Sequence, residues 1–306
     1  MNLLIGADSQ LGKNFKLVLK KTVFLNKKQF NIKNEKDLEK AFRKYKPKLL
    51  FNCIGFTDTS LDIKKVKSSI ELNGSDLISV INLCNTYKVK LIHFSSNAVF
   101  NGNKRNSYIE NDLVDPISSY GLSKFIGERL IQIYSNNYLI FRISSLYSEY
   151  QSSGKIKKNF IDQLQEGLLN KKVLKIHNQK TNPTHTYDLV MQIKKILNKF
   201  NNEIVHCCSK NHTNWYEFAK HIQNNYFNYG KIECLDLKKN NKNKISSNLS
   251  MYPSKLVKKN LLVLPNWQTQ LKNYLKKDRN GFYTIYLLKL PLYLQRLSCN
   301  LNQDNL

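Results

Sequence analysis

Short apolar runs and longer stretches of helical period alternate along the first half of the chain. The apolar runs are bounded by polar residues, which is typical of buried strands, and they occupy residues 2–5, 22–25, 49–54, 89–94 and 138–142. Apolar side chains recur at helical spacing between them, in a stretch ending near Lys20 and at 35–45, 66–87 and 119–134. Strands that alternate with helices predict an α/β fold, a doubly wound parallel sheet covered on both faces.

The second half alternates less regularly. Helices are predicted at 160–169, 187–200 and 215–226, with short apolar runs at 173–176 and 204–207. We expect a sheet domain at residues 1–148 and a smaller, mainly substrate-binding C-terminal domain at 149–277, some segments of which return to the sheet. Residues 278–306 are predicted to be an apolar C-terminal extension, and their sequence indicates no role.

The chain is strongly basic, with 49 lysines and arginines against 22 acidic residues and a net charge of +27 over 306 residues. All but six of the basic residues are lysines, scattered along the sequence. Specific nucleic-acid readers rely on arginine forks and aromatic stacking platforms, so we predict no specific nucleic-acid partner. The charge favours anionic ligands, such as nucleotide-linked molecules. Weak association with an anionic membrane surface is a further hypothesis.

Neither export nor metal binding is indicated. The first residues have no basic segment ahead of an apolar stretch, and no apolar run reaches about 18 residues, so we predict a cytoplasmic protein. The six cysteines form no CxxC pair, and His93, His185 and His206 lack the spacing of metal ligands. We therefore predict no metal site and expect structural roles for these histidines.

The first chemical signal is the turn after the first strand. Gly6 and Gly12 stand at the outer positions of a glycine turn, which would bring backbone N–H groups at the helix start close to a pyrophosphate. The same turn also occurs without a ligand. Ser9 stands where a middle glycine is usual, and its side chain is expected to crowd the phosphate or tilt the dinucleotide.

The end of the second strand indicates which dinucleotide is preferred. A carboxylate there would bind a ribose 2′-hydroxyl, whereas basic residues suit a 2′-phosphate. The chain reads Asn26-Lys27-Lys28, with no carboxylate. This favours NADP(H) over NAD(H).

The second signal is Tyr120 with Lys124, one helical turn apart at the start of the predicted helix 119–134. An ammonium beside a phenol lowers the pKa of the phenol, so the tyrosine becomes usable as an acid–base group near neutral pH. The preceding strand ends in Ser95-Ser96, which puts a hydroxyl at the carboxyl edge of the sheet. The alternative is a surface helix with an incidental tyrosine.

These segments together resemble the extended short-chain dehydrogenase/reductases, and among them the dTDP-4-dehydrorhamnose reductase family. The resemblance spans roughly residues 1–277 and rests on 6–12, 52–57, 93–102, 108–110, 120–124, 141–144, 159–160, 179–188, 215–219 and 264–267. It implies a Rossmann-type domain with a smaller domain closing over a nucleotide sugar. The implied reaction is NADPH-dependent reduction of the 4-keto group of a nucleotide-linked 6-deoxy sugar, as in dTDP-L-rhamnose biosynthesis.

The resemblance also implies roles for individual residues. Tyr120 would give its proton to the developing 4-alkoxide, Lys124 would lower the pKa of Tyr120 and bind the nicotinamide ribose, and Ser96 would hydrogen-bond the keto oxygen. The implied cofactor-binding residues are Gly6, Ser9, Gln10, Leu11, Gly12, Asn31, Ile32, Gly55, Phe56, Thr57, Tyr120 and Lys124. The implied substrate-binding residues are Ser96, Asn97 and Ser145, and a homodimer is a further hypothesis.

Several positions depart from the family pattern. Asn97 replaces an aspartate beside the catalytic hydroxyl, and Ser145 replaces a tryptophan that would contact the sugar. Ser60-Leu61 stand in place of Asp-Lys, and Ile245-Ser246 in place of an Arg-Pro whose guanidinium would clamp phosphate. These changes keep three alternatives open: a different nucleotide sugar, a non-catalytic NADP-binding regulatory subunit resembling that of methionine adenosyltransferase, or an epimerase or dehydratase of the same superfamily.

Overall fold

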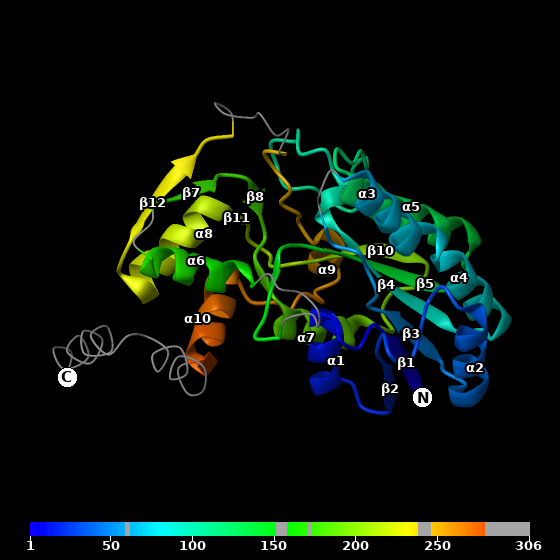
Figure 1. The fold of residues 1–306 in the computed structure, drawn as a ribbon. Helices are drawn as coiled ribbons and strands as arrows, with labels where there is room; N and C mark the ends of the chain where they lie inside the picture. Colours follow the sequence, from blue (N-terminus) through cyan, green and yellow to red (C-terminus); the bar gives the residue numbers. More distant parts are fainter. Residues whose placement is uncertain (59–61, 151–157, 171–172, 238–245, 279–306) are drawn as a thin grey trace. The chain divides into compact units, whose positions relative to one another are not determined.

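A computed structural model describes residues 1–58, 62–150, 158–170, 173–237 and 246–278 (Figure 1). Residues 1–267 form one compact unit, and a second unit begins at Gln268. The domain boundary proposed at residue 148 stays a prediction. The extension proposed at 278–306 lies, beyond its first residue, outside the described residues.

The central sheet has six parallel strands in the order β10-β5-β4-β3-β1-β2. They are β1 Asn2–Ile5, β2 Thr22–Leu25, β3 Leu49–Asn52, β4 Lys90–Ser96, β5 Tyr138–Ile143 and β10 Glu203–Cys207. The chain adds β2 on one side of β1 and β3 on the other, so the winding direction reverses between β1 and β3. Ligands of open α/β sheets bind at such a reversal. This topology confirms the predicted doubly wound fold.

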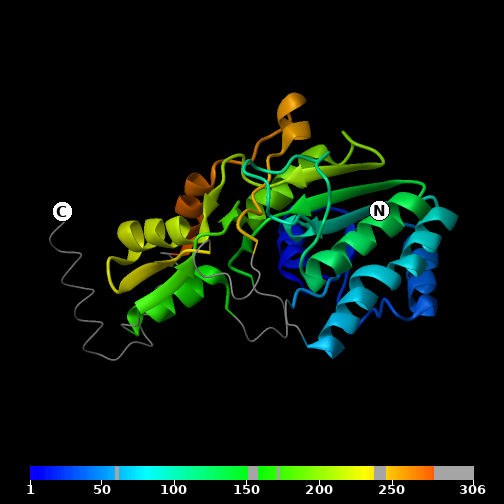
Figure 2. The same cartoon turned by 90° about the horizontal axis from the view of Figure 1, so that it is seen from above.

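Helices cover both faces of the sheet (Figures 1 and 2). One face carries α1 Gln10–Val18 and α7 Thr186–Ile196, and the other carries α2 Glu35–Tyr45, α4 Leu77–Thr86 and α5 Ser119–Tyr134. Successive side chains of a strand point to opposite faces, so Leu4 packs on the α1 side while Leu3 and Ile5 pack on the α2 side. All three are fully buried. Burial on both faces explains why the strands appear as unbroken apolar runs.

The helix predicted at 66–87 is wrong in its middle. The segment consists of α3 Ile63–Ile70, a π-helical turn η1 Glu71–Ser75 and then α4. The wide turn carries the backbone of Asn73 against α5, where a Cβ added to Gly127 would lie 2.3 Å from the Asn73 carbonyl oxygen. Apolar periodicity cannot reveal this turn, because its cause is a contact with a helix far along the sequence.

The rest of the compact unit is built from short elements. They are the strand pairs β6 Leu146–Tyr147 with β9 Thr184–His185, β7 Val173–His177 with β12 Lys231–Leu235 and β8 Lys180–Thr181 with β11 Thr213–Asn214, the helices α6 Phe160–Leu169, α8 Trp215–Ile222 and α9 Ser254–Lys258, the 3₁₀ turn η2 Asn97–Val99 and the π turn η3 Gln223–Phe227. A further helix, α10, spans Trp267–Asp278. The predicted helix 215–226 therefore ends its α-helical part at Ile222. Phe160, Trp215 and Phe218 pack against one another in tilted and edge-to-face contacts and join α6 to α8.

The described ranges contain no helix that is long and apolar enough to cross a membrane. They also contain no group of three or more histidine, cysteine or acidic side chains arranged to hold a metal ion.

A buried lysine joins the sheet to the end of α7. The Lys90 ammonium donates to the carbonyl oxygens of Leu197 at 3.0 Å and Phe200 at 2.6 Å and to Asn201 Oδ1 at 2.5 Å. Carbonyl groups at a helix C-terminus lack partners within the helix, so this ammonium completes the end of α7.

We expect Lys90→Met to lower the free energy of unfolding by about 1–3 kcal/mol, because the carbonyl groups that it serves lose their donor inside the protein. Urea denaturation measures the loss. Lys195→Met, at an exposed position of α7, is the matched control. Equal stability of the two variants would contradict the assigned role of Lys90.

Candidate functional site

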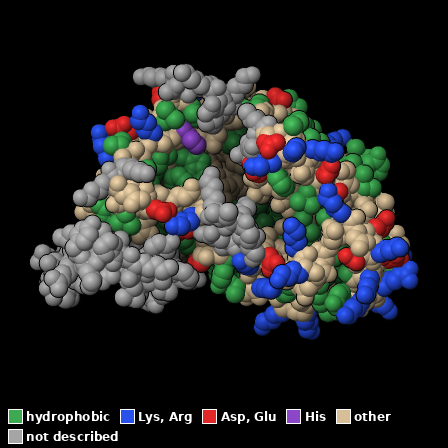
Figure 3. Space-filling view, in the orientation of Figure 1, with side chains coloured by type: hydrophobic (Ala, Val, Ile, Leu, Met, Phe, Trp, Pro, Cys, Tyr) green, Lys and Arg blue, Asp and Glu red, His purple; other side chains and the backbone are tan. Residues whose placement is uncertain are grey.

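A cavity of about 690 Å³ opens at the carboxyl edge of the sheet, at the reversal between β1 and β3. It extends from Asn26 after β2, past the turn between β1 and α1, to Tyr120 on α5 and Ser145 after β5. Figure 3 shows the surface of residues 1–267 hollowed between the helices on the α5 side and the part that carries α6 and α8. The cavity brings most of the predicted site residues together, while Gly12, Phe56 and Asn97 do not line it.

The turn between β1 and α1 has the shape that the glycine pattern predicts. Gly6 has φ +82°, a conformation that L side chains rarely adopt. Ser9 has φ −71°, so the position of the missing middle glycine needs no special backbone freedom. Its Oγ accepts a hydrogen bond from Gly12 N at 3.0 Å and caps α1. The Ser9 oxygen thus faces the helix start, and Ser9, Gln10 and Leu11 line the cavity at this end of α1.

The far end of the cavity is formed by the segment after β2. Asn26 Oδ1 accepts from the backbone N–H groups of Lys28 and Gln29 and closes a turn that leaves Lys27 exposed along the cavity. Asn31 lines the same end beside buried Phe30 and Ile32. Among the described residues that line the cavity, the one carboxylate belongs to Asp8, on the β1–α1 turn.

Asn73 holds the middle of the cavity in place, and the sequence patterns did not single it out. Its Oδ1 accepts from Phe56 N and its Nδ2 donates to Phe56 O, both at 2.9 Å. The same Nδ2 donates to Ser123 Oγ on α5, also at 2.9 Å. The loop of Gly55 and Thr57 is thereby fixed to the helix that carries Tyr120 and Lys124. The available signal was the Asn73-Gly74 pair inside an otherwise apolar helical stretch.

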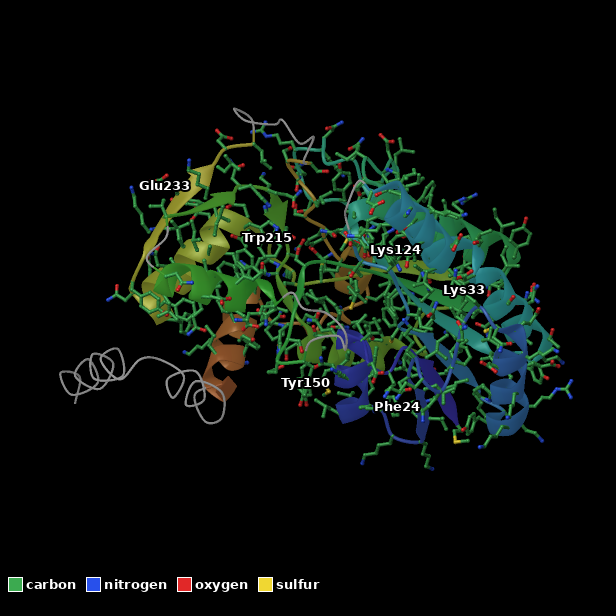
Figure 4. The ribbon with its side chains drawn as sticks, in the orientation of Figure 1. Phe24, Lys33, Lys124, Tyr150, Trp215 and Glu233 are labelled. Carbon is green, nitrogen blue, oxygen red and sulfur yellow. The ribbon has the colours of Figure 1, made fainter. Side chains whose placement is uncertain are left out.

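Backbone contact places Tyr120 beside Ser96. Ser118 Oγ accepts from Gly121 N at 3.0 Å and caps α5. A Cβ added to Gly121 would lie 2.1 Å from the carbonyl oxygen of Ala98, so no side chain fits between α5 and η2. The Ser96 hydroxyl accepts from Ala98 N at 3.1 Å and hydrogen-bonds the Tyr120 phenol. Ser96, Tyr120 and Lys124 therefore line one cavity (Figure 4, where Lys124 is labelled).

The electrostatics of this group are set by burial. Burial raises the pKa of Tyr120, and the hydrogen bond with Ser96 lowers it in part. The charge of Lys124 is not among the causes of that shift, so its predicted effect on Tyr120 stays a prediction. Burial lowers the pKa of Lys124 to about 8, while the Glu128 carboxylate one turn along α5 acts in the opposite direction.

The other ionisable groups near Lys124 are either paired or uncharged. Glu128 accepts two hydrogen bonds from Arg142, Nε to Oε1 at 2.9 Å and Nη2 to Oε2 at 2.8 Å, in a buried pair. Burial lowers the pKa of His93 well below its usual value and raises that of Cys53. Both groups are therefore uncharged near pH 8, where Lys124 titrates.

The two predicted substrate positions that depart from the family pattern, Asn97 and Ser145, are linked through the hydroxyl groups of Ser144 and Thr181. Asn97 accepts from Ser96 Oγ at 3.2 Å and donates to Ser144 Oγ at 3.0 Å and to Leu249 O at 2.9 Å. Ser145 lines the cavity and its hydroxyl is hydrogen-bonded to Thr181. The departures at Ser60-Leu61 and at Ile245 lie outside the described residues.

Comparisons with known proteins agree with this architecture. A family model described as RmlD substrate binding domain matches residues 1–280. The Bacillus subtilis spore coat polysaccharide biosynthesis protein SpsK is 29% identical over 225 residues, 72% of this chain and 77% of that protein. The Streptomyces niveus dTDP-4-keto-6-deoxy-D-glucose reductase is 24% identical over 223 residues, 71% of this chain and 76% of its own length.

A solved structure has the same fold. The dTDP-4-dehydrorhamnose reductase of Bacillus anthracis, determined in complex with NADP, aligns with a TM-score of 0.80 at 23% identity and covers 90% of this chain and 100% of its own. The likeness confirms the predicted Rossmann-type architecture.

The pKa of Lys124 leads to a pH test of cofactor binding. Lys124 carries its charge below pH 8 and loses it above, so we expect NADPH to bind about tenfold more weakly at about pH 9.5 than at about pH 6.5. Fluorescence titration at each pH measures the dissociation constant. Lys124→Met should bind weakly at both pH values. A pH-independent affinity of the unaltered protein would contradict the expected contact of the Lys124 ammonium with the cofactor.

Proposed function

The chain belongs to the RmlD substrate binding domain family, and on this basis we propose that it is an NADPH-dependent reductase of a nucleotide-linked 4-keto-6-deoxy sugar. The observation that carries the proposal is the convergence of Ser96, Tyr120 and Lys124 on the cavity that also holds the β1–α1 turn. The relatives named as reductases of dTDP-linked sugars support dTDP-4-dehydrorhamnose, or a close analogue, as the substrate. The reaction would then belong to dTDP-L-rhamnose synthesis.

The residues of the cavity suit a dinucleotide. The left-handed turn at Gly6 leads into the start of α1, which would lie against a pyrophosphate. Asn31 and Ile32 would lie along the adenine, Lys27 would meet a ribose 2′-phosphate, and Gly55 and Thr57 would line the middle of the cofactor. Reduced nicotinamide, when bound, supplies the hydride that adds to the 4-keto carbon.

The chain's own residues handle the proton and the developing negative charge. The phenol of Tyr120 would pass its proton to the oxygen that becomes the 4-hydroxyl, and the Ser96 hydroxyl would turn from Asn97 Oδ1 to donate a hydrogen bond to the same oxygen. Lys124 would stabilise the resulting phenolate and bind the nicotinamide ribose. Burial keeps Tyr120 protonated before the reaction, since it raises the pKa of the phenol.

We expect Tyr120→Phe to lower turnover by about two orders of magnitude or more and to leave NADPH binding nearly unchanged, because the variant loses a proton donor and little else. NADPH absorbance with dTDP-4-keto-6-deoxy sugars measures turnover. Tyr134→Phe, at an exposed tyrosine on the same helix, is the control. Unaltered turnover in Tyr120→Phe would overturn the assigned roles. Cofactor binding without any NADPH consumption by the unaltered protein would favour the regulatory-subunit alternative.

The preference for NADP(H) is tested at Lys27. We expect Lys27→Ala to weaken NADPH binding about five- to tenfold and to leave NADH binding unchanged, because the ammonium would contact the 2′-phosphate alone. Equilibrium titration with each cofactor gives the ratio of the dissociation constants. Lys28→Ala removes a neighbouring charge that does not line the cavity and should leave the ratio unchanged. A ratio insensitive to Lys27 would remove the basis for the preference.

A further inference from the structure

A chain of hydrogen bonds runs behind the reacting groups, from Ser96 to a second hydroxyl on the cavity wall. Its members are Ser96, Asn97, Ser144, Thr181 and Ser145. Ser144 Oγ lies 3.2 Å from Thr181 Oγ1, which in turn hydrogen-bonds Ser145 Oγ. Ser144 and Thr181 are buried, whereas Ser145 lines the cavity. The chain thus joins the predicted catalytic serine to a surface that would face the sugar.

The orientation of the Asn97 amide is fixed at both ends. Nδ2 lies 2.9 Å from the carbonyl oxygen of Leu249, which only accepts, so the nitrogen must be on that side. Oδ1 then faces Ser96 Oγ, and because an amide oxygen only accepts, it is the Ser96 hydroxyl that donates to Asn97. The second proton of Nδ2 goes to Ser144 Oγ at 3.0 Å.

The direction of the remaining hydrogen bonds follows from that amide. Ser144 Oγ accepts from Asn97 and also from Asn182 N at 3.4 Å, so its own proton is donated to Thr181. Among the described residues Thr181 Oγ1 bonds only Ser144 and Ser145, and since it accepts from Ser144 its own proton goes to Ser145. The oxygen of Ser145 is therefore an acceptor within the chain, and its proton is left for an acceptor in the cavity.

The backbone at Ser145 holds this hydroxyl on the cavity wall at a conformational cost. Ser145 has φ +35°, which is unusual for a residue with a side chain. Its carbonyl oxygen accepts from Thr184 N at 3.1 Å, and β6 begins at the next residue and pairs with β9. Such strain persists where surrounding contacts impose it, and it gathers at ligand sites.

We propose that Asn97 is a positioning residue that makes Ser145 a hydrogen-bond donor to an acceptor oxygen on the sugar ring of the substrate. The inference rests on the proposed function, because it takes a nucleotide sugar as the ligand. An aspartate at position 97 would accept from Ser144 and reverse every later bond, since a carboxylate has no proton to donate. Ser145 would then donate to Thr181 and offer the ligand only its lone pairs. Residue 97 thereby decides whether Ser145, on the cavity wall, donates or accepts a hydrogen bond, although residue 97 does not itself line the cavity.

The test compares two probes in equilibrium binding to the NADP⁺-loaded protein. Both are dTDP-glucose derivatives with the hydroxyl of one carbon replaced, by fluorine as an acceptor or by an ammonium as a donor, prepared at C2 and at C3. We expect the unaltered protein to bind the fluoro sugar about fivefold more tightly than the amino sugar at the carbon that faces Ser145. Asn97→Asp should reverse this preference.

Two further variants separate the direction of the chain from simple attraction of the ammonium by the introduced carboxylate. Thr181→Val interrupts the chain of hydrogen bonds, so the ratio of the two probe affinities should shrink toward unity. In the Asn97→Asp, Thr181→Val double variant, the aspartate should then have no effect through Ser145. Thr213→Val, directly across the β11–β8 pair from Thr181, is the matched control and should retain the fluoro preference. Thermal melting checks that each variant is folded. If Asn97→Asp does not fold, the probe preference of Thr181→Val alone decides the test.

The outcomes distinguish this inference from the proposed function. Binding of dTDP-glucose with a probe preference that neither Asn97→Asp nor Thr181→Val changes overturns the inference and leaves the proposed function standing. A reversal that persists in the Asn97→Asp, Thr181→Val double variant assigns the effect to charge and also overturns it. Absence of any dTDP-sugar binding by the unaltered protein overturns both.

Discussion

The site depends on how closely α5 approaches the backbone around it. At its start, the Ala98 carbonyl occupies the space of a side chain at Gly121, and six residues later the Asn73 carbonyl does the same at Gly127. These contacts leave no room for adjustment, so α5 has one position relative to the end of β4 and to the loop of Gly55 and Thr57. Tyr120 and Lys124 lie close to these contacts, on the first turns of the helix. Their distance from Ser96 is therefore determined by backbone packing rather than by mobile side chains.

The same approach explains why polar side chains are buried around α5. Asn73 satisfies the backbone of Phe56 and the hydroxyl of Ser123, and Arg142 satisfies both oxygens of Glu128. Buried polar groups are tolerated only when they are paired, and each of these pairs joins α5 to a different element. The network thus fixes α5 in place and also sets the field that Lys124 experiences.

Much of this architecture could be predicted from the sequence, and the remainder could not for physical reasons. Buried strands have a local signature, so 2–5 and 22–25 were predicted with the bounds of β1 and β2. That Tyr120 and Lys124 lie on one face of a helix near a strand end could be expected, because the two residues are separated by one helical turn and follow a strand. The role of Asn73 was not predicted because its partners lie at positions 56 and 123. The hydrogen bonds of Asn97 were not predicted because they reach as far as Leu249. Contacts over such separations have no periodic trace in the sequence.

Lys124 also shows what this architecture demands of folding. The unfolded chain holds the Lys124 proton with an ordinary pKa of 10.5, whereas the folded chain holds it with a pKa of about 8. The unfolded state therefore binds more protons between these values, and the contribution of Lys124 to stability rises as the pH increases through that window. At neutral pH the folded chain therefore holds this ammonium, buried in the cavity wall, at a cost in stability that the unfolded chain does not bear.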